Sequence, residues 1–180
     1  MLAVGSLSAN KNFGLVVEAF NRLDRDDLVL AVAGGQNAGV FARYQLRETA
    51  NVVRLGYVSD AALRALYEHA LCFVLPSLYE GFGIPPVEAM LCGCPAIVST
   101  APALVEICGD GALVCDPHDP DTLARQIGRL ADDADLRRQM RERGLVRGRR
   151  FTWDASAERL DAVLQSFGLE RPLPAIGRPA

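Results

Sequence analysis

The sequence predicts an α/β fold in which a six-stranded parallel sheet carries helices on both faces. Short apolar runs alternate with segments of helical periodicity along the chain, and half of its 180 residues are apolar, which is enough for a full core. Strands that alternate with helices are joined by right-handed crossovers and pair in parallel. We therefore expect one Rossmann-like domain over residues 1–168. Residues 169–180 are expected to be a loose tail, because prolines 172 and 174 cannot continue a helix.

Six short apolar segments fit buried strands. In chain order they are Leu2–Gly5, Leu28–Ala33, Val52–Leu55, Leu71–Leu75, Ala96–Ser99 and Ala112–Cys115. Gly34-Gly35 follows the second segment and Pro76 ends the fourth, as expected for residues that interrupt a strand.

Helical periodicity and capping residues predict the elements between and after these strands. Ser59 is a good N-cap, and Leu63 and Tyr67 after it share one helix face. Asp119 is expected to cap a helix that starts at Pro120. The other predicted helices are Gly14–Leu23, Val40–Arg47, Pro85–Leu91, Leu104–Ile107, Ala134–Val146 and Thr152–Phe167.

Ligands of open parallel sheets bind outside the carboxyl ends of the strands. This rule selects five loops as the place of a candidate site. They are Ser6–Lys11, Gly34–Asn37, Gly56–Ser59, Pro76–Ile84 and Thr100–Pro102.

The most informative segment is Pro76–Met90, which combines a strand end, two loop glycines, a helix start, and the carboxylates Glu80 and Glu88. Glycines let the backbone approach a ligand, and a helix N-terminus seats phosphate oxygens. Carboxylates would repel phosphate, but they accept hydrogen bonds from adjacent sugar hydroxyls. A nucleoside diphosphate sugar fits all of these features. The alternative is that both glutamates are solvated carboxylates, favoured near a helix start by its dipole.

This segment resembles the Glu-x7-Glu signature of the family 4 retaining glycosyltransferases, which have the GT-B fold. The resemblance implies that the chain is the C-terminal, donor-binding half of such an enzyme. The matching pieces of the signature are Pro76-Ser77, Glu80-Gly81-Phe82-Gly83, Pro85-Pro86 and Glu88-Ala89-Met90. Other pieces follow in the family's order, namely Val4-Gly5-Ser6-Leu7 with Lys11-Asn12, Leu55–Ser59, Gly93-Cys94-Pro95 and Phe151-Thr152-Trp153.

The resemblance implies a role for each matching residue. Glu88 is expected to bind the ribose hydroxyls, Glu80 the hydroxyls of the donor sugar, and Lys11 the diphosphate. The remaining expected donor contacts are Ser6 in the phosphate loop, Tyr57 and Val58 beside the base, and the backbone N–H groups of Gly81, Phe82, Gly83 and Ile84.

The resemblance also implies a retaining transfer that needs no metal and no other cofactor. Glu80 and Lys11 are the expected catalytic residues, and they act by electrostatic stabilisation of the leaving diphosphate, not by nucleophilic attack from Glu80. Many relatives carry an arginine at the position of Ser6 or of Asn10, and this chain has an arginine at neither position. Lys11 is therefore the basic side chain that this loop offers to the phosphates.

Three other enzyme classes fit less well. The first strand is not followed by the G-x-G-x-x-G of a dinucleotide-binding oxidoreductase, and Lys11 lacks the flanking residues of a P-loop. A glycoside hydrolase would explain the two carboxylates but not the phosphate-seating loop. A module that binds a nucleotide sugar without transferring it remains an alternative, since GT-B enzymes use two domains and this chain has room for one. We expect the isolated chain to show little or no transfer.

Cysteine and histidine spacing argues against a metal site. The five cysteines show no paired C-x-x-C spacing, and neither His69 nor His118 has a second ligand pattern nearby. We expect buried, reduced cysteines in a cytoplasmic protein. No charged leader precedes Leu2, so no signal peptide is expected, and no apolar run approaches the roughly 20 residues that span a bilayer.

Expectations for partners follow from charge and from the resemblance. The net charge of −3 argues against nucleic acid. Seven arginines between Arg137 and Arg150 favour a solvated helix face, and peripheral contact with the inner face of the bacterial membrane stays open.

Gly34–Asn37 and Gly56–Glu68 resemble bacterial mannosyltransferases of polysaccharide and O-antigen assembly. GDP-mannose is thus the favoured donor, ahead of UDP-sugars, and a glycan or lipid-linked acceptor is expected, held by a missing N-terminal domain. The oligomeric state stays open.

Overall fold

The computed structural model describes residues 1–5, 8–35 and 51–168. The chain divides into two compact units, Met1–Arg149 and Arg150–Ala180, which we describe separately. The single domain over residues 1–168 therefore stays a prediction. The predicted helix Val40–Arg47 and the predicted tail over residues 169–180 lie outside the described residues.

The first unit is built on a parallel sheet whose six described strands lie in the order β3-β2-β1-β4-β5-β6, which confirms the predicted fold class. The strands are β1 (Leu2–Val4), β2 (Leu30–Ala33), β3 (Val52–Gly56), β4 (Phe73–Leu75), β5 (Ala96–Ser99) and β6 (Ala112–Cys115). β2 starts two residues later than predicted. Leu2, the first residue of β1, pairs with Ala31, so the residues before Leu30 have no paired residue on β1.

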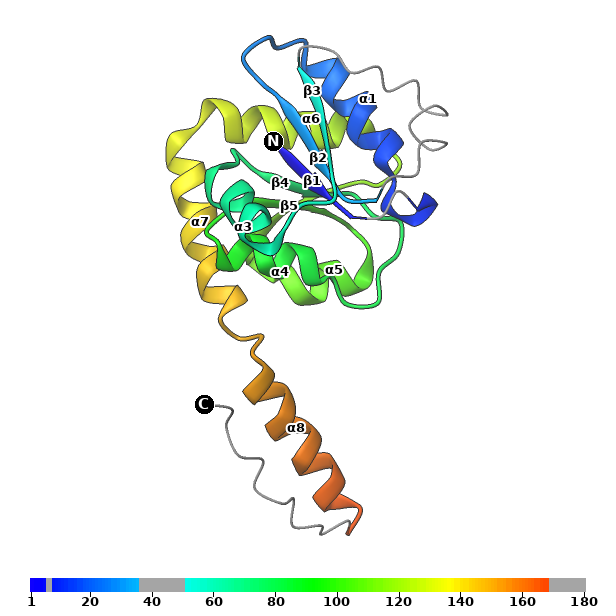
Figure 1. Cartoon of the computed structure of the whole chain (residues 1–180), viewed down its shortest axis with the longest axis vertical. Coiled ribbons are helices and arrows are strands. Elements are labelled where there is room, and N and C mark those ends of the chain that lie inside the picture. Colours follow the sequence, from blue (N-terminus) through cyan, green and yellow to red (C-terminus); the bar gives the residue numbers. More distant parts are fainter. Residues whose placement is uncertain (6–7, 36–50, 169–180) are drawn as a thin grey trace. The chain divides into compact units, whose positions relative to one another are not determined.

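Helices cover both faces of the sheet (Figure 1). α1 (Phe13–Leu23) and α6 (Pro120–Asp132) pack against each other on one face, where Leu123 and Ile127 of α6 join the same core cluster as Val16 of α1. The opposite face carries α3 (Asp60–His69), α4 (Ile84–Leu91) and α5 (Pro102–Cys108). α7 (Ala134–Gly148) contacts α4 and the 3-10 turn η2 (Gly109–Gly111).

The predicted helix caps are confirmed. The Ser59 hydroxyl accepts a hydrogen bond from the Ala62 amide at 3.3 Å, and α3 begins at the next residue. Asp119 Oδ1 accepts one from the Asp121 amide at 2.9 Å, and α6 begins at Pro120 as expected. Each cap satisfies an N–H group that the helix itself leaves without a partner.

The second unit contains α8 (Trp153–Ser166). Its N-cap is Thr152, whose hydroxyl accepts a hydrogen bond from the Ala155 amide at 3.1 Å. The helix predicted over Thr152–Phe167 is thus confirmed to within one residue at each end.

Two arginines of the arginine-rich segment stabilise neighbouring helix ends. Arg147 on α7 donates through Nε to the Ile107 carbonyl at 2.8 Å and through its terminal nitrogen to the Glu106 carbonyl, both in the last turn of α5. Arg137 donates to the Leu130 and Ala131 carbonyls near the end of α6. Such carbonyls have no partner within their own helix.

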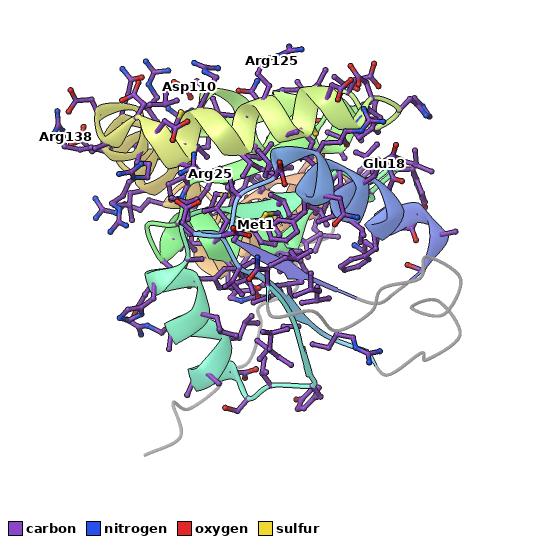
Figure 2. The ribbon with its side chains drawn as sticks, turned by 90° about the horizontal axis from the view of Figure 1, so that it is seen from above. Met1, Glu18, Arg25, Asp110, Arg125 and Arg138 are labelled. Atoms are coloured by element: carbon purple, nitrogen blue, oxygen red, sulfur yellow. The ribbon has the colours of Figure 1, made fainter. Side chains whose placement is uncertain are left out.

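Other arginines of this segment are solvated, as the sequence favoured. Arg138, Arg141 and Arg143 are exposed on α7. Figure 2 shows Arg138 on α7 and Arg125 on α6 pointing away from the ribbon.

Replacing Arg147 by alanine is expected to lower the free energy of unfolding by about 1–2 kcal/mol, because two charge-assisted hydrogen bonds to α5 are lost. Thermal unfolding followed by circular dichroism measures this change. Arg143→Ala removes an exposed arginine from the same helix and should change stability by less than about 0.5 kcal/mol. Equal effects of the two substitutions would contradict the capping role.

Candidate functional site

The loops at the carboxyl ends of β1, β4 and β6 are held together by hydrogen bonds from the Asn12 side chain and by one backbone hydrogen bond. After β1 the chain forms the 3-10 turn η1 (Ala9–Lys11) and then α1. Asn12 lies at the corner between them in the left-handed conformation, with φ of 55°. Its Nδ2 donates to the Pro76 carbonyl at 3.1 Å and to the Pro117 carbonyl at 2.7 Å. The Leu78 amide also donates to the Asn10 carbonyl at 2.8 Å. These bonds fix the phosphate loop predicted after β1 against the loop after β4.

Lys11 and Glu80 meet in this place. Lys11 Nζ donates to Glu80 Oε1 at 2.6 Å, and the two side chains are only 15% and 11% exposed. The Lys11 stem lies over Gly5, because a Cβ built on Gly5 would be 3.7 Å from Lys11 Cε. The tertiary structure thus joins the two residues that the sequence predicted to be catalytic, although 69 residues separate them. A mostly buried cation and carboxylate next to a helix start can bind an anion and a hydroxyl side by side.

Ser77 supplies a second donor to the same carboxylate oxygen. Its hydroxyl donates to Glu80 Oε1 at 2.6 Å, and its side chain is fully buried. Sequence analysis placed Ser77 in the signature but gave it no role. The only signal for it was its position three residues before Glu80 in a loop that ends a buried strand.

The helix after this loop starts in a strained conformation that suits glycine. Gly83 is the N-cap of α4, with φ of 99°, and a Cβ on it would lie 2.7 Å from Leu104 Cδ2. Pro85 and Pro86 in the first turn have no backbone N–H. The donors at this helix start are therefore limited to Ile84 and the loop residues before it, which are the N–H groups assigned to the donor from the sequence.

Glu88 lies further along α4, on the exposed side of the helix. Its Oε2 accepts a hydrogen bond from the hydroxyl of Tyr67 on α3 at 3.4 Å. Burial, followed by the nearby Glu88 charge, raises the pKa of Tyr67, so its hydroxyl stays a proton donor at neutral pH. Among the described residues, no hydrogen bond joins Glu88 to Lys11 or Glu80. The two glutamates of the signature therefore have separate surroundings.

The predicted base-facing residues follow β3. Tyr57 is 83% exposed, whereas Val58 is half-buried and lines an apolar cavity of about 640 Å3 between the sheet and α3. Leu2 and Ala31 line this cavity from the sheet, and Leu66 lines it from α3. The cavity does not include Lys11 or Glu80. Because this cavity is lined mostly by apolar side chains, we place the candidate site at the Lys11–Glu80 pair. Ser6 lies outside the described residues.

The cysteines are free and mostly buried. Burial raises the pKa of the Cys72 thiol to about 11 and that of the Cys94 thiol to about 12. Burial also raises the pKa values of the Cys108 and Cys115 thiols. Such thiols stay protonated at neutral pH and are poor nucleophiles. In the described part of the chain, no three His, Cys, Asp or Glu side chains gather to hold a metal ion, and no helix is long and apolar enough to cross a bilayer.

Sequence reasoning missed three residues that shape this site. Asn12 holds the loops together, Ser77 contacts Glu80, and Tyr67 contacts Glu88. Asn12 carries a weak local signal, since asparagine tolerates the left-handed conformation better than most residues. Tyr67 shares its predicted helix face with Leu63 and is buried, but its hydroxyl contact with Glu88 depends on how α3 and α4 pack.

Residues 1–147 match the family described as "Glycosyl transferases group 1". The chain is 36% identical over 160 residues to the O-antigen chain mannosyltransferase B of Escherichia coli, which covers 85% of this chain and 42% of that protein. It is 32% identical over 182 residues to the mannosylfructose-phosphate synthase of Agrobacterium fabrum, covering 92% of this chain and 40% of the relative. The chain thus spans about two fifths of the length of these relatives.

Solved structures share the fold. The sucrose-phosphate synthase of Thermosynechococcus elongatus superposes with a TM-score of 0.79 at 26% identity, covering 93% of this chain and 45% of the other. HepE of Anabaena, solved in complex with UDP-glucose, gives a TM-score of 0.78 at 21% identity, covering 92% and 48%. In both cases the chain corresponds to slightly less than half of the larger protein.

Proposed function

Because the chain belongs to the glycosyl transferases group 1 family, we propose that it binds a nucleoside diphosphate sugar and forms the donor half of a sugar-transfer site. The observation that carries this proposal is the Lys11–Glu80 contact of 2.6 Å between the loops after β1 and β4. It places a mostly buried cation and a carboxylate beside the start of α4, at the strand ends where such folds bind ligands.

In this proposal Lys11 and the N–H groups before α4 bind the diphosphate, while Glu80 accepts hydrogen bonds from hydroxyls of the donor sugar. Glu88 binds the ribose hydroxyls. In the transfer step the bond between the anomeric carbon and the diphosphate oxygen breaks, and a bond to the acceptor oxygen forms on the same face of the sugar. The acceptor proton passes to the leaving diphosphate. Lys11 acts by stabilising the negative charge that develops on the leaving group.

We propose mannose as the donor sugar and GDP as its carrier. The mannose assignment is supported by relatives that are mannosyltransferases. They include the O-antigen chain mannosyltransferase B of Escherichia coli and the MMP alpha-(1->4)-mannosyltransferase of Mycolicibacterium hassiacum, which is 40% identical over 112 residues. The guanine base is supported by the resemblance of Gly34–Asn37 and Gly56–Glu68 to bacterial mannosyltransferases.

A second domain is proposed to hold the acceptor, because the chain spans 42% of the Escherichia coli relative and slightly less than half of each solved neighbour described above. The isolated chain is then expected to bind the donor but to show little or no transfer. Transfer by the isolated chain to a simple sugar acceptor would contradict this part of the proposal.

The proposal is tested by calorimetric titration of the chain with GDP, UDP and ADP and then with their sugar conjugates. Binding of one nucleotide is expected, with GDP favoured, and it should persist in the presence of EDTA because no metal is proposed. Glu88→Ala should weaken nucleotide binding by about tenfold or more, because the ribose loses a carboxylate acceptor.

Glu142→Ala, which removes an exposed glutamate from α7, is the matched control and should leave affinity unchanged. The absence of binding to all three nucleotides at about 1 mM, in a chain that is folded by circular dichroism, would contradict the proposed function.

A further inference from the structure

We infer that Ser77 is a positioning residue that orients the Glu80 carboxylate toward the donor sugar. This inference rests on the proposed function and deepens it. It starts from one carboxylate oxygen, Glu80 Oε1, which accepts a hydrogen bond from Lys11 Nζ at 2.6 Å and another from the Ser77 hydroxyl at 2.6 Å. No hydrogen bond from the described residues reaches Oε2. Two donors on Oε1 therefore fix the plane of the carboxylate and leave Oε2 as the acceptor for a ligand hydroxyl.

The burial of Ser77 sets it apart from an ordinary loop serine. Within the described residues, Ser77 and Ser99 are the fully buried polar side chains, each with an exposed fraction of 0%. Burying a hydroxyl costs free energy unless it forms a hydrogen bond. The hydrogen-bond partner of the Ser77 hydroxyl is Glu80 Oε1, so the burial of this hydroxyl and the orientation of that carboxylate depend on the same contact.

Ser99 connects this contact to the sheet. Ser99 is the last residue of β5, and its hydroxyl donates to the Ser77 carbonyl at 2.5 Å while accepting a hydrogen bond from the Ala101 amide at 3.2 Å. The Ser77 backbone is thereby held against the end of a fully buried strand. The loop that carries the Glu80 carboxylate needs such support, because the geometry of a site is held more accurately when rigid elements anchor it.

Lys11 alone could not hold Glu80 in the presence of the donor. Its ammonium group would be shared between the carboxylate and the diphosphate, and a lysine ammonium is a flexible point charge. The Ser77 hydroxyl is neutral and fully buried, so an arriving diphosphate does not compete for it in the same way. Ser77 is the donor that keeps Glu80 oriented when Lys11 turns to the phosphates.

The expected consequence is a selective loss of affinity for the sugar. Ser77→Ala should reduce the affinity of the full chain for GDP-mannose by about tenfold, because a hydrogen bond to a charged group is lost, and reduce the affinity for GDP by less than about twofold. Calorimetric titration with these two probes, or with the nucleotide and conjugate that the wild-type chain selects, gives the ratio. Ser77→Thr keeps the hydroxyl and should restore the wild-type ratio.

Thr122→Ala is the control, because it removes a hydroxyl that donates to the Asp119 carbonyl at 2.7 Å at the start of α6 and leaves both donors to Glu80 Oε1 and the support of Ser77 in place. It should lower the melting temperature while changing the ratio of the two affinities by less than about threefold. If Ser77→Ala weakened GDP and GDP-mannose equally, or if Ser77→Thr behaved like Ser77→Ala, the positioning role would be overturned.

A measurement without ligand separates this inference from the proposed function. In a double-mutant cycle on thermal unfolding, Ser77→Ala should lower the melting temperature of the wild-type chain clearly more than that of the Glu80→Ala chain, because the contact exists only when both groups are present. Additive shifts would overturn the inference whatever the chain binds. Non-additive shifts in a chain that binds no nucleotide sugar would support the contact and reject the proposed function instead.

Discussion

Replacing Lys11 by alanine is expected to reduce the affinity for the nucleoside diphosphate by about 100-fold. Truncating one partner of a buried, hydrogen-bonded charge pair between two bound molecules costs about 2–5 kcal/mol of binding free energy, and about 2.7 kcal/mol corresponds to 100-fold in a dissociation constant. Lys11 is only 15% exposed, and its partner Glu80 is 11% exposed. The substitution therefore removes the cation that neutralises the diphosphate and leaves a carboxylate charge beside the phosphate seat.

The repulsion from this carboxylate can be measured separately. In the Lys11→Ala chain, a second substitution, Glu80→Gln, should recover about tenfold of the lost affinity for the bare nucleotide, because the amide carries no negative charge. Calorimetric titration of wild type, both single variants and the double variant gives the coupling between the two positions.

A matched control keeps the Lys11 result specific. Arg22→Ala removes a cation of α1 whose side chain is 40% exposed and pairs with Glu18 and Asp121. It should leave nucleotide affinity within about twofold of wild type, since exposed ion pairs contribute little. Unchanged affinity in a folded Lys11→Ala chain would place the phosphate seat elsewhere.

Replacing Gly34 by alanine is expected to lower the free energy of unfolding by about 3 kcal/mol or more. Gly34 follows β2 with φ of 120°, where residues with a side chain are strained, and its added Cβ would lie 2.2 Å from the Gly5 carbonyl oxygen. Gly5 is itself tied to β2, because its amide donates to the Ala33 carbonyl at 3.1 Å. The clash is with backbone, so a side-chain rotation cannot relieve it, and the ends of β1 and β2 would have to separate.

Thermal unfolding provides the measurement, with a decrease in melting temperature of roughly 6–12 °C expected for a protein of this size. The neighbouring glycine is the control. A Cβ on Gly35 meets no atom within 4 Å, so Gly35→Ala should shift the melting temperature by less than about 2 °C. A small effect of Gly34→Ala would show that the close approach of the two strand ends is not required for folding.

Local signals explain why so much of the fold was predictable. β5 and β6 have the predicted bounds Ala96–Ser99 and Ala112–Cys115, because their apolar runs are flanked by residues that interrupt strands. α6 begins where Asp119 and Pro120 predict it, because capping depends on the next two or three residues only. β2 is shorter than predicted, because a strand extends only as far as its neighbour pairs with it, and its neighbour is distant in the sequence.

The candidate site likewise has residues that the sequence predicted and contacts that it did not. Sequence analysis named Lys11, Glu80 and Glu88 from the resemblance of their segments, and the family that this resemblance indicated is confirmed. The roles of these residues stay predictions until nucleotide binding is measured. The contacts of Ser77, Asn12 and Tyr67 were not predicted, because each joins groups whose approach depends on loop conformation or helix packing.

By itself, the sequence determined the order of the strands and helices along the chain, two helix caps and the loops at the strand ends, because these depend on patterns that span a few residues. It also determined the family, because several short motifs follow one another in the family's order. Only the tertiary structure decided which side chains meet. Lys11 contacts Glu80 across 69 residues, and Asn12 contacts Pro117 across 105. Parallel strand pairing brings these distant residues together, because it places the carboxyl ends of β1, β4 and β6 at the same end of the sheet. The exact contacts between their side chains depend on how the buried residues of the whole sheet pack, which no local sequence pattern specifies.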